Sequence, residues 1–258
     1  MWHAIVREVS SAIGQCELTH LVRQPIDIDL ASKQHHHYLK TLELLGCQVH
    51  CLPEEPALPD SVFVEDAAII FDEIAILTRP GAISRRPEIP DIESALRPFR
   101  PLEEIKEPGT IDGGDVLCIG KMVYVGLSSR SNRSAIEQLK HHLSPYGYQV
   151  VGVEIKDCLH LKSAVSLLTE EHILINPNWV DMNVFTAVKP IEIDPLEPHG
   201  ANVLSVNQGA IYPANFPRTQ EHIEEVLARY GRRLVVVDVS ELQKAEGAVT
   251  CCSLLLRT

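Results

Sequence analysis

Four short segments of the sequence carry side chains that could act together in catalysis. In chain order, their reactive groups belong to Asp60, Glu65, Asp66, Asp112, His160, Cys251 and Cys252. A thiol, an imidazole and a carboxylate that orients the imidazole are the groups that covalent catalysis by cysteine requires. The additional carboxylates would attract a cationic substrate and repel an anionic one. The segments therefore indicate a cysteine nucleophile that acts on a positively charged molecule.

Each segment also has an ordinary structural explanation. Acids around the predicted strand between Asp60 and Glu65 are typical of a solvated strand edge, and a turn at Gly113 and Gly114 needs no ligand. A lone histidine or a buried cysteine packs more often than it reacts. Because adjacent residues on a strand face opposite sides, at most one of the two neighbouring cysteines would point into a pocket.

Two arginines that follow predicted strands, Arg85 and Arg130, add a second kind of binding group. A guanidinium at some distance from the acids can clamp a carboxylate through paired hydrogen bonds. An amino acid with a cationic side chain would satisfy both the acids and the arginines. The sequence has no glycine motif for phosphates. The histidines of 35–37 would point in different directions from one helix, so we expect no metal site there.

The composition argues against a nucleic-acid partner. The 258 residues include 35 acidic and 23 basic side chains, a net charge of −12, and no basic run that would hold a polyanion. No apolar stretch approaches the ~20 residues of a membrane helix, and residues 1–15 lack the apolar run of a secretory signal. Seven cysteines without paired metal spacing are typical of a reduced protein, so we expect it in the cytoplasm.

A repeated unit would position these segments. Hairpins, with two short apolar strands around a polar turn, are predicted at residues 67–81, 114–129, 163–178 and 201–216. Amphipathic helices are predicted within 32–46, 92–96, 131–142 and 219–230, and further strands at 150–155 and 233–239. Such units pack against each other to bury their apolar faces. We therefore expect one α/β domain over residues 1–258, although four hairpins could also occur by chance.

The segments together resemble the dimethylarginine dimethylaminohydrolases of the pentein, or arginine deiminase-like, superfamily. The resemblance runs from Leu18 to Cys252. It is carried by LPDSVFVED (58–66), LTRPGAISRR (77–86), TIDGGDVL (110–117), VGLSSRSN (125–132), LHLKS (159–163) and TCCS (250–253). It implies a five-bladed β/α propeller with pseudo-fivefold symmetry and one ββαβ module per blade, which accords with the repeated unit.

The resemblance also implies roles for individual residues. Cys251 matches the nucleophile, and His160 matches the acid and base. Asp112 matches the carboxylate that orients this histidine and faces the guanidinium of the substrate. Glu65 and Asp66 match the remaining contacts to the guanidinium.

The resemblance implies a separate set of contacts for the amino-acid end of the substrate. They are Arg85 and Arg130 for the carboxylate, and Asp60 with the backbone carbonyls of Leu18 and Ala245 for the α-amino group. Leu18 would lie on a lid loop, continued by residues 19–29, before a helix that starts near Ile28. The sequence carries Glu246 where relatives commonly have an aspartate, and Asp112 where some have a glutamate.

These roles predict hydrolysis of Nω,Nω-dimethylarginine or Nω-methylarginine to citrulline and dimethylamine or methylamine, through a covalent thiouronium on Cys251. No cofactor or metal is required, because a guanidinium held in place is already electrophilic. The expected partner is a small-molecule substrate, not a nucleic acid or a membrane, and a homodimer is compatible with the sequence.

Three alternatives stay open. The first is a related enzyme that acts on free arginine or agmatine. The second is a non-catalytic pentein-fold protein that binds arginine-like cations. The third is a metal hydrolase that uses Asp60, Glu65, Asp66 and His160.

Overall fold

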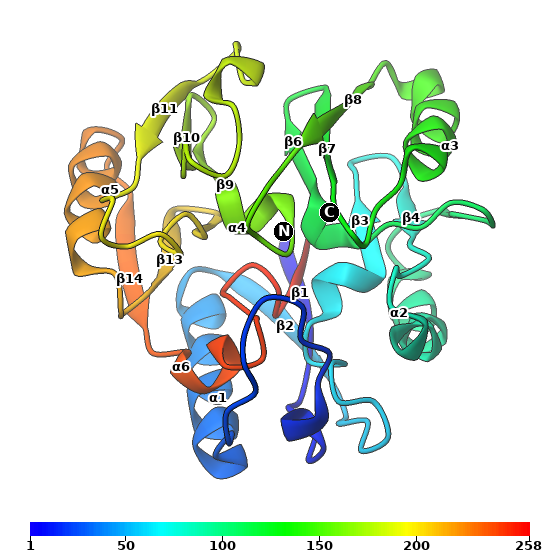
Figure 1. The fold of residues 1–258 in the computed structure, drawn as a ribbon, viewed down its shortest axis with the longest axis horizontal. Helices are drawn as coiled ribbons and strands as arrows, with labels where there is room; N and C mark the ends of the chain where they lie inside the picture. Colours follow the sequence, from blue (N-terminus) through cyan, green and yellow to red (C-terminus); the bar gives the residue numbers. More distant parts are fainter.

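Five three-stranded sheets stand around a common centre in the computed structural model, which describes all 258 residues (Figure 1). The sheets are β3 (Ala68–Ile70), β4 (Ala75–Leu77) and β5 (Leu102–Glu104); β6 (Val116–Ile119), β7 (Met122–Leu127) and β8 (Gln149–Glu154); β9 (Val165–Thr169), β10 (His172–Ile175) and β11 (Lys189–Glu192); β12 (Leu204–Val206), β13 (Gly209–Pro213) and β14 (Arg233–Val237); and β15 (Leu254–Arg257), β1 (Trp2–Arg7) and β2 (Cys47–Leu52). In each sheet the middle strand pairs antiparallel with the first and parallel with the third. The expected five-bladed propeller is confirmed.

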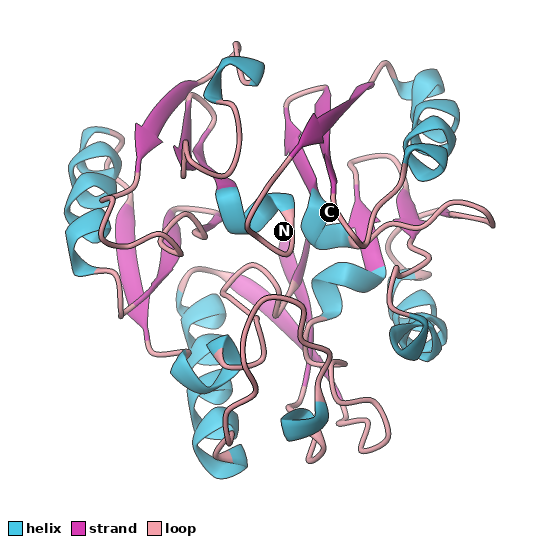
Figure 2. Ribbon diagram, in the orientation of Figure 1, coloured by secondary structure: helices cyan, strands magenta, loops and turns pink.

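Long helices connect the second and third strands of four sheets and lie on the outside of the ring (Figure 2). They are α1 (Ile28–Leu44), α2 (Ile89–Leu96), α3 (Arg133–Leu143) and α5 (Pro217–Arg229). The short helices α4 (Leu161–Ala164) and α6 (Ser240–Gln243) instead lie between sheets, before the first strands β9 and β15. The third sheet departs from the ββαβ pattern, because its connection carries only the 3-10 helix Met182–Val184. No helix has both the length and the apolar character that a bilayer crossing demands.

Helix α3 shows how the sequence sets one of these connections. The Asn132 side chain caps the first turn by accepting a hydrogen bond from the Ala135 backbone N–H. Ala135, Ile136 and Leu139 recur on one face and are buried against the second sheet's strands. Because both the cap and the apolar spacing are local, the predicted helix is confirmed here.

The fifth sheet closes the ring with strands from the two ends of the chain. Strand β15 pairs antiparallel with β1, with Trp2 opposite Arg257, and α1 leads from β1 to β2. The first strands of neighbouring sheets pack against one another, β15 with β3 and β12 with β9. The segments that precede these first strands therefore converge on the centre of the propeller.

Candidate active site

The predicted catalytic residues and guanidinium contacts share one position in the repeat, since each lies just before the first strand of its sheet. Glu65 and Asp66 precede β3, Asp112 precedes β6, His160 precedes β9 and Cys251 precedes β15. The propeller brings these four segments together although they are far apart in the sequence. The site is therefore built from equivalent positions in successive repeats of the fold.

Two local expectations were wrong. The segment between Asp60 and Asp66 is not a strand; a turn leads into the 3-10 helix Val64–Ala67. Its backbone cannot pair as a strand, because the Glu65 N–H donates to the Cys251 carbonyl at 3.1 Å across the centre. Cys251 and Cys252 also lie in a turn and not on a strand. The two cysteines nevertheless separate as predicted, since Cys252 is buried in the core and Cys251 lines a cavity.

The Gly113-Gly114 pair allows the backbone to approach the site closely. A Cβ atom on Gly113 would lie 1.9 Å from the Glu65 carbonyl oxygen, and one on Gly114 would lie 2.6 Å from His160 Nδ1. The Gly114 N–H donates to Asp66 Oδ1 at 2.9 Å. The glycines are therefore required by close packing against two predicted catalytic segments.

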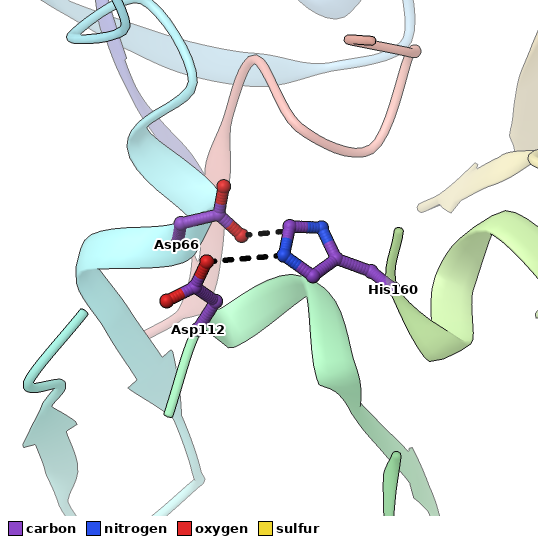
Figure 3. A group of neighbouring side chains, drawn as sticks. All are labelled: Asp66, Asp112 and His160. Atoms are coloured by element: carbon purple, nitrogen blue, oxygen red, sulfur yellow. Dashed lines mark hydrogen bonds and ion pairs between the residues drawn. The ribbon is translucent and has the colours of Figure 1, made fainter. Parts of the chain in front are cut away.

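His160 lies between two carboxylates (Figure 3). Its Nε2 is 3.1 Å from Asp112 Oδ2, and its Nδ1 is 3.9 Å from Asp66 Oδ1. Asp112 is itself fixed, because its Oδ1 accepts a hydrogen bond from the Gly81 N–H at 2.9 Å. All three side chains are buried. The structure thus places Asp112 where it can orient the imidazole.

The two carboxylates control the charge of His160. Burial by itself would lower the pKa of the imidazole, but the attraction of Asp66 and the hydrogen bond to Asp112 outweigh burial and raise this pKa to about 9. His160 is therefore an imidazolium at neutral pH. It can donate a proton to a departing amine without first collecting one from solvent.

The stability of the fold should fall when His160 loses its proton. The pKa of His160 is about 9 in the folded protein against an ordinary value of 6.5, so the stabilisation is complete below pH 6.5 and is lost as the pH rises through about 9. At about 1.4 kcal/mol per pH unit, the contribution is about 3 kcal/mol. Urea unfolding at pH 6.5 and above pH 9 measures it. Between these two pH values, the free energy of unfolding should fall further in the wild type than in His160→Gln. Equal falls in the two proteins would contradict the raised pKa of His160.

Asp66 also has a buried cation as partner. Arg85 Nη1 donates to Asp66 Oδ2, while Arg85 Nε and Nη2 donate to Glu88 at 3.0 and 2.9 Å. Burial would raise the pKa of Asp66, but His160 and Arg85 lower it to about 2. Asp66 therefore stays a carboxylate throughout the physiological range.

Glu65 is committed to groups inside the protein. Its Oε1 accepts from Lys162 Nζ at 2.6 Å, and its Oε2 accepts from the Thr250 hydroxyl at 2.9 Å. The amide of Asn202 in turn holds Thr250 by donating to its hydroxyl and accepting from its backbone N–H. Thr250 precedes Cys251, so this network fixes the turn that carries the thiol.

Sequence reasoning missed Lys162 and Asn202 as parts of the site. Asn202 had a signal, because in the fourth hairpin it occupies the place before the first strand that Asp66 and His160 occupy in theirs. Lys162 belongs to the segment that carries His160, but its ion pair with Glu65 joins residues 97 apart in the chain.

Cys251 and His160 line the same small cavity, of about 20 Å³. The other lining residues are Glu17, Asp60, Phe63, Asp66, Arg85, Arg130, Leu159, Ala245, Glu246 and Gly247. Burial raises the pKa of the Cys251 thiol, and the charges of Glu65 and Asp66 raise it further. The thiol is therefore protonated at neutral pH until a positive charge arrives beside it.

The residues expected for the amino-acid end of a substrate lie on this cavity with one exception. Asp60, Arg85, Arg130 and Ala245 line it, whereas Leu18 does not and its neighbour Glu17 does. The Asp60 carboxylate accepts the Glu17 backbone N–H at 3.1 and 3.2 Å. Arg130 Nη1 lies 3.6 Å from Asp112 Oδ2, and Nη2 donates to the Thr19 hydroxyl at 3.1 Å.

A metal ion would have to compete with the cations already present. Asp66, Asp112 and His160 offer ligand atoms within 4.8 Å of one another. Arg85 and Arg130, however, lie against the two carboxylates, and a metal binds the neutral form of histidine. The donor set suits an organic cation better than a metal.

Comparison with known proteins agrees with this geometry. The family described as N,N dimethylarginine dimethylhydrolase, eukaryotic, matches residues 19–257. A dimethylarginine dimethylaminohydrolase of Streptomyces coelicolor is 38% identical over 259 aligned positions, which cover 98% of this chain and 96% of that protein. The chain belongs to the dimethylarginine dimethylaminohydrolase family.

Solved structures of this family superpose closely on the chain. A cysteine-to-serine variant of the Pseudomonas aeruginosa enzyme in complex with citrulline is 35% identical, with a TM-score of 0.91 and 98% of both chains covered. A histidine-to-glycine variant of a dimethylarginine dimethylaminohydrolase, as an adduct with S-methyl-L-thiocitrulline, is 34% identical, with a TM-score of 0.90 and 98% and 99% of the two chains covered.

Proposed function

We propose that this protein hydrolyses Nω,Nω-dimethylarginine or Nω-methylarginine to citrulline and dimethylamine or methylamine. The observation that carries the proposal is the shared cavity, where the protonated His160 and the thiol of Cys251 meet the Asp66 carboxylate. Membership of the family supports the same conclusion, as does the citrulline complex of the Pseudomonas aeruginosa relative.

The first step forms a carbon–sulfur bond and breaks a carbon–nitrogen bond. Binding of the substrate cation shifts the Cys251 thiol to the thiolate, and the thiol proton is released to solvent. The thiolate attacks the guanidinium carbon, and His160 gives its proton to the methylated nitrogen, which leaves as a neutral amine. Asp66 and Asp112 hold the positive charge of the guanidinium while the tetrahedral intermediate forms. The product of this step is a thiouronium on Cys251 and a neutral His160.

The second step consumes one water molecule. Neutral His160 takes a proton from the water as it attacks the thiouronium carbon, and the carbon–sulfur bond breaks to regenerate the thiolate. The remaining proton of the water is released and ends on the free amine. Water and the substrate cation together become citrulline and an alkylammonium ion, so one histidine serves as acid and then as base.

Contacts at the other end of the substrate would set its position. We assign the α-carboxylate to Arg85 and Arg130 and the α-amino group to Asp60 with the carbonyls of Leu18 and Ala245. Four of the five line the cavity. Arg85 already donates to Asp66, Glu88 and two carbonyls, so Arg130 carries most of the free capacity to donate.

Alkylation of Cys251 in the ligand-free protein should be slow at neutral pH. The raised pKa of the thiol keeps the reactive thiolate scarce, and a guanidinium beside Asp66 would stabilise it. A small guanidinium-like cation should therefore accelerate reaction with a neutral alkylating reagent at Cys251. Mass spectrometry of the labelled peptide measures the rate. Fast labelling without the cation would contradict substrate-assisted deprotonation.

The released amine tests the function directly. The protein is incubated separately with arginine, Nω-methylarginine, Nω,Nω-dimethylarginine and agmatine, and citrulline and the amine are identified. Release of methylamine or dimethylamine supports the proposal. Ammonia released from arginine would identify the related enzyme that acts on free arginine. Turnover of agmatine, which has no carboxylate, would show that Arg85 and Arg130 are not needed to bind one. Binding without citrulline formation would identify a non-catalytic protein that binds arginine-like cations.

The proposed chemistry needs no cofactor, and a chelator should leave turnover unchanged. Loss of activity that a divalent metal restores would instead favour a metal hydrolase. All seven cysteines are unpaired, which supports a reducing compartment such as the cytoplasm.

A further inference from the structure

The loop between Cys16 and Asp27 closes over the catalytic cavity and holds few buried side chains. It follows the 3-10 helix Ile13–Gln15 and precedes α1, and most of its side chains are exposed. A segment with so little buried surface opens at low free-energy cost. The cavity beneath it, about 20 Å³, has room for one or two water molecules. An arginine-sized substrate must therefore bind through opening of this loop.

Glu246 is the residue that holds the tip of the loop. Its Oε1 accepts the backbone N–H groups of His20 and Leu21 at 2.5 and 2.6 Å, and its Oε2 accepts that of Thr19 at 2.9 Å. Three successive N–H groups that converge on one carboxylate form an anion-binding nest, here occupied by a side chain of the same protein. Bonds of this charge-assisted kind are stronger than neutral ones.

The backbone of Glu246 is held in an unfavourable conformation to make these bonds. Its φ is +59°, which is uncommon for a residue with a long side chain. Ala245 before it and Gly247 after it are both buried and line the catalytic cavity. The strained backbone of Glu246 thus lies between the wall of the catalytic cavity and the tip of the loop. Such strain is explained if Glu246 serves to position the loop.

Ser84, Glu241 and Lys244 bond only the two ends of the loop, at Glu17, Asp27 and Pro25. Two further bonds to the loop come from groups that the proposed substrate would also use. Asp60 accepts the Glu17 N–H, and Arg130 donates to the Thr19 hydroxyl. The Glu246 carboxylate bonds only the loop. Beside the loop tip lies a second cavity of about 220 Å³ that His20, Leu21 and Glu246 line, so there is unfilled space next to the Glu246 carboxylate.

We propose that Glu246 is the latch of a lid made by residues 17–27, and that it sets the fraction of the protein whose substrate site is closed and assembled. Glu246 is a positioning residue that acts through the lid and contacts no reacting atom. The proposal rests on the proposed function for its kinetic consequence only. A closed lid keeps Glu17 and the Leu18 backbone at the α-amino end of the substrate, and the apparent affinity scales with the closed fraction.

The test compares Glu246→Gln with Glu246→Asp. Glutamine keeps the size of the side chain, but its single amide oxygen cannot accept three N–H groups, and its NH₂ would face donors. Aspartate keeps the charge on a shorter arm. Glu225→Gln on the exposed face of α5 is the matched control. Circular dichroism confirms that each variant is folded.

Hydrogen exchange of the peptide that contains Thr19, His20 and Leu21 gives the first readout, and it needs no substrate. Glu246→Gln should exchange roughly tenfold faster than the wild type, Glu246→Asp at an intermediate rate and the control at the wild-type rate. Unchanged exchange in Glu246→Gln would overturn the latch, whether or not the protein turns over methylated arginine.

Steady-state kinetics give the second readout. Glu246→Gln should raise KM about tenfold with little change in kcat, because bound substrate closes the lid in place of the latch. Equal losses in kcat and kcat/KM with an unchanged KM would overturn the proposal, since they indicate a contact made only in the transition state. If the wild type released no amine from methylated arginine, the proposed function would fail and the exchange result would still decide the latch.

Discussion

Cys251→Ser should lower kcat by about 10⁴-fold or more, because a serine hydroxyl in this cavity has no neighbouring base strong enough to ionise it. His160 is already protonated at neutral pH and cannot take the hydroxyl proton. The thiol, by contrast, needs only the arriving guanidinium to shift its equilibrium toward the thiolate. Citrulline formation over hours at high protein concentration measures the residual rate.

The neighbouring cysteine supplies the matched control. Cys252 is buried, its Sγ lies 3.5 Å from the Ala248 carbonyl, and it packs in the hydrophobic core between the fourth and fifth sheets. Cys252→Ala should keep kcat nearly unchanged and lose about 1–2 kcal/mol of stability through the cavity it leaves. Activity that survived in Cys251→Ser and vanished in Cys252→Ala would reverse the assignment.

The four hairpins could be predicted from the sequence because their signals are local. Apolar alternation around a short polar turn specifies both strands of a hairpin such as β6 and β7 without reference to the remainder of the chain. The fifth sheet had no such signal. Its strands β15 and β1 lie at opposite ends of the sequence, and only closure of the ring brings them together. The number of blades therefore came from the family resemblance.

The residue types of the site could be predicted, but their local backbone could not. Glu65 and Asp66 were expected beside a strand because apolar residues surround them. The chain forms a 3-10 helix there since its N–H groups find partners across the propeller centre, such as the Cys251 carbonyl. Ion pairs such as Lys162 with Glu65 depend on the same closure. Local sequence signals contain no information on such distant pairing.

His160→Gln should lower kcat with methylated arginine by about 10²–10⁴-fold, because proton transfer to the amine and from the water both disappear. Glutamine can still hydrogen-bond Asp112, but it carries no proton to donate and accepts none. The two steps can be separated by a substrate whose leaving group needs no proton. S-alkyl thiocitrullines lose an alkanethiolate, which departs far more easily than an amine anion.

With such a substrate, His160→Gln should still form the thiouronium and then stall, because no base activates the water of the second step. Intact-mass spectrometry should show the adduct accumulating, and peptide mapping should place it on Cys251. The wild type should show little adduct, since its second step remains fast. Turnover of the thiol substrate at the wild-type rate without an adduct would assign the base of the second step to another group. Asp66 and Asp112 would then be the next candidates, because they are the acids closest to the imidazole.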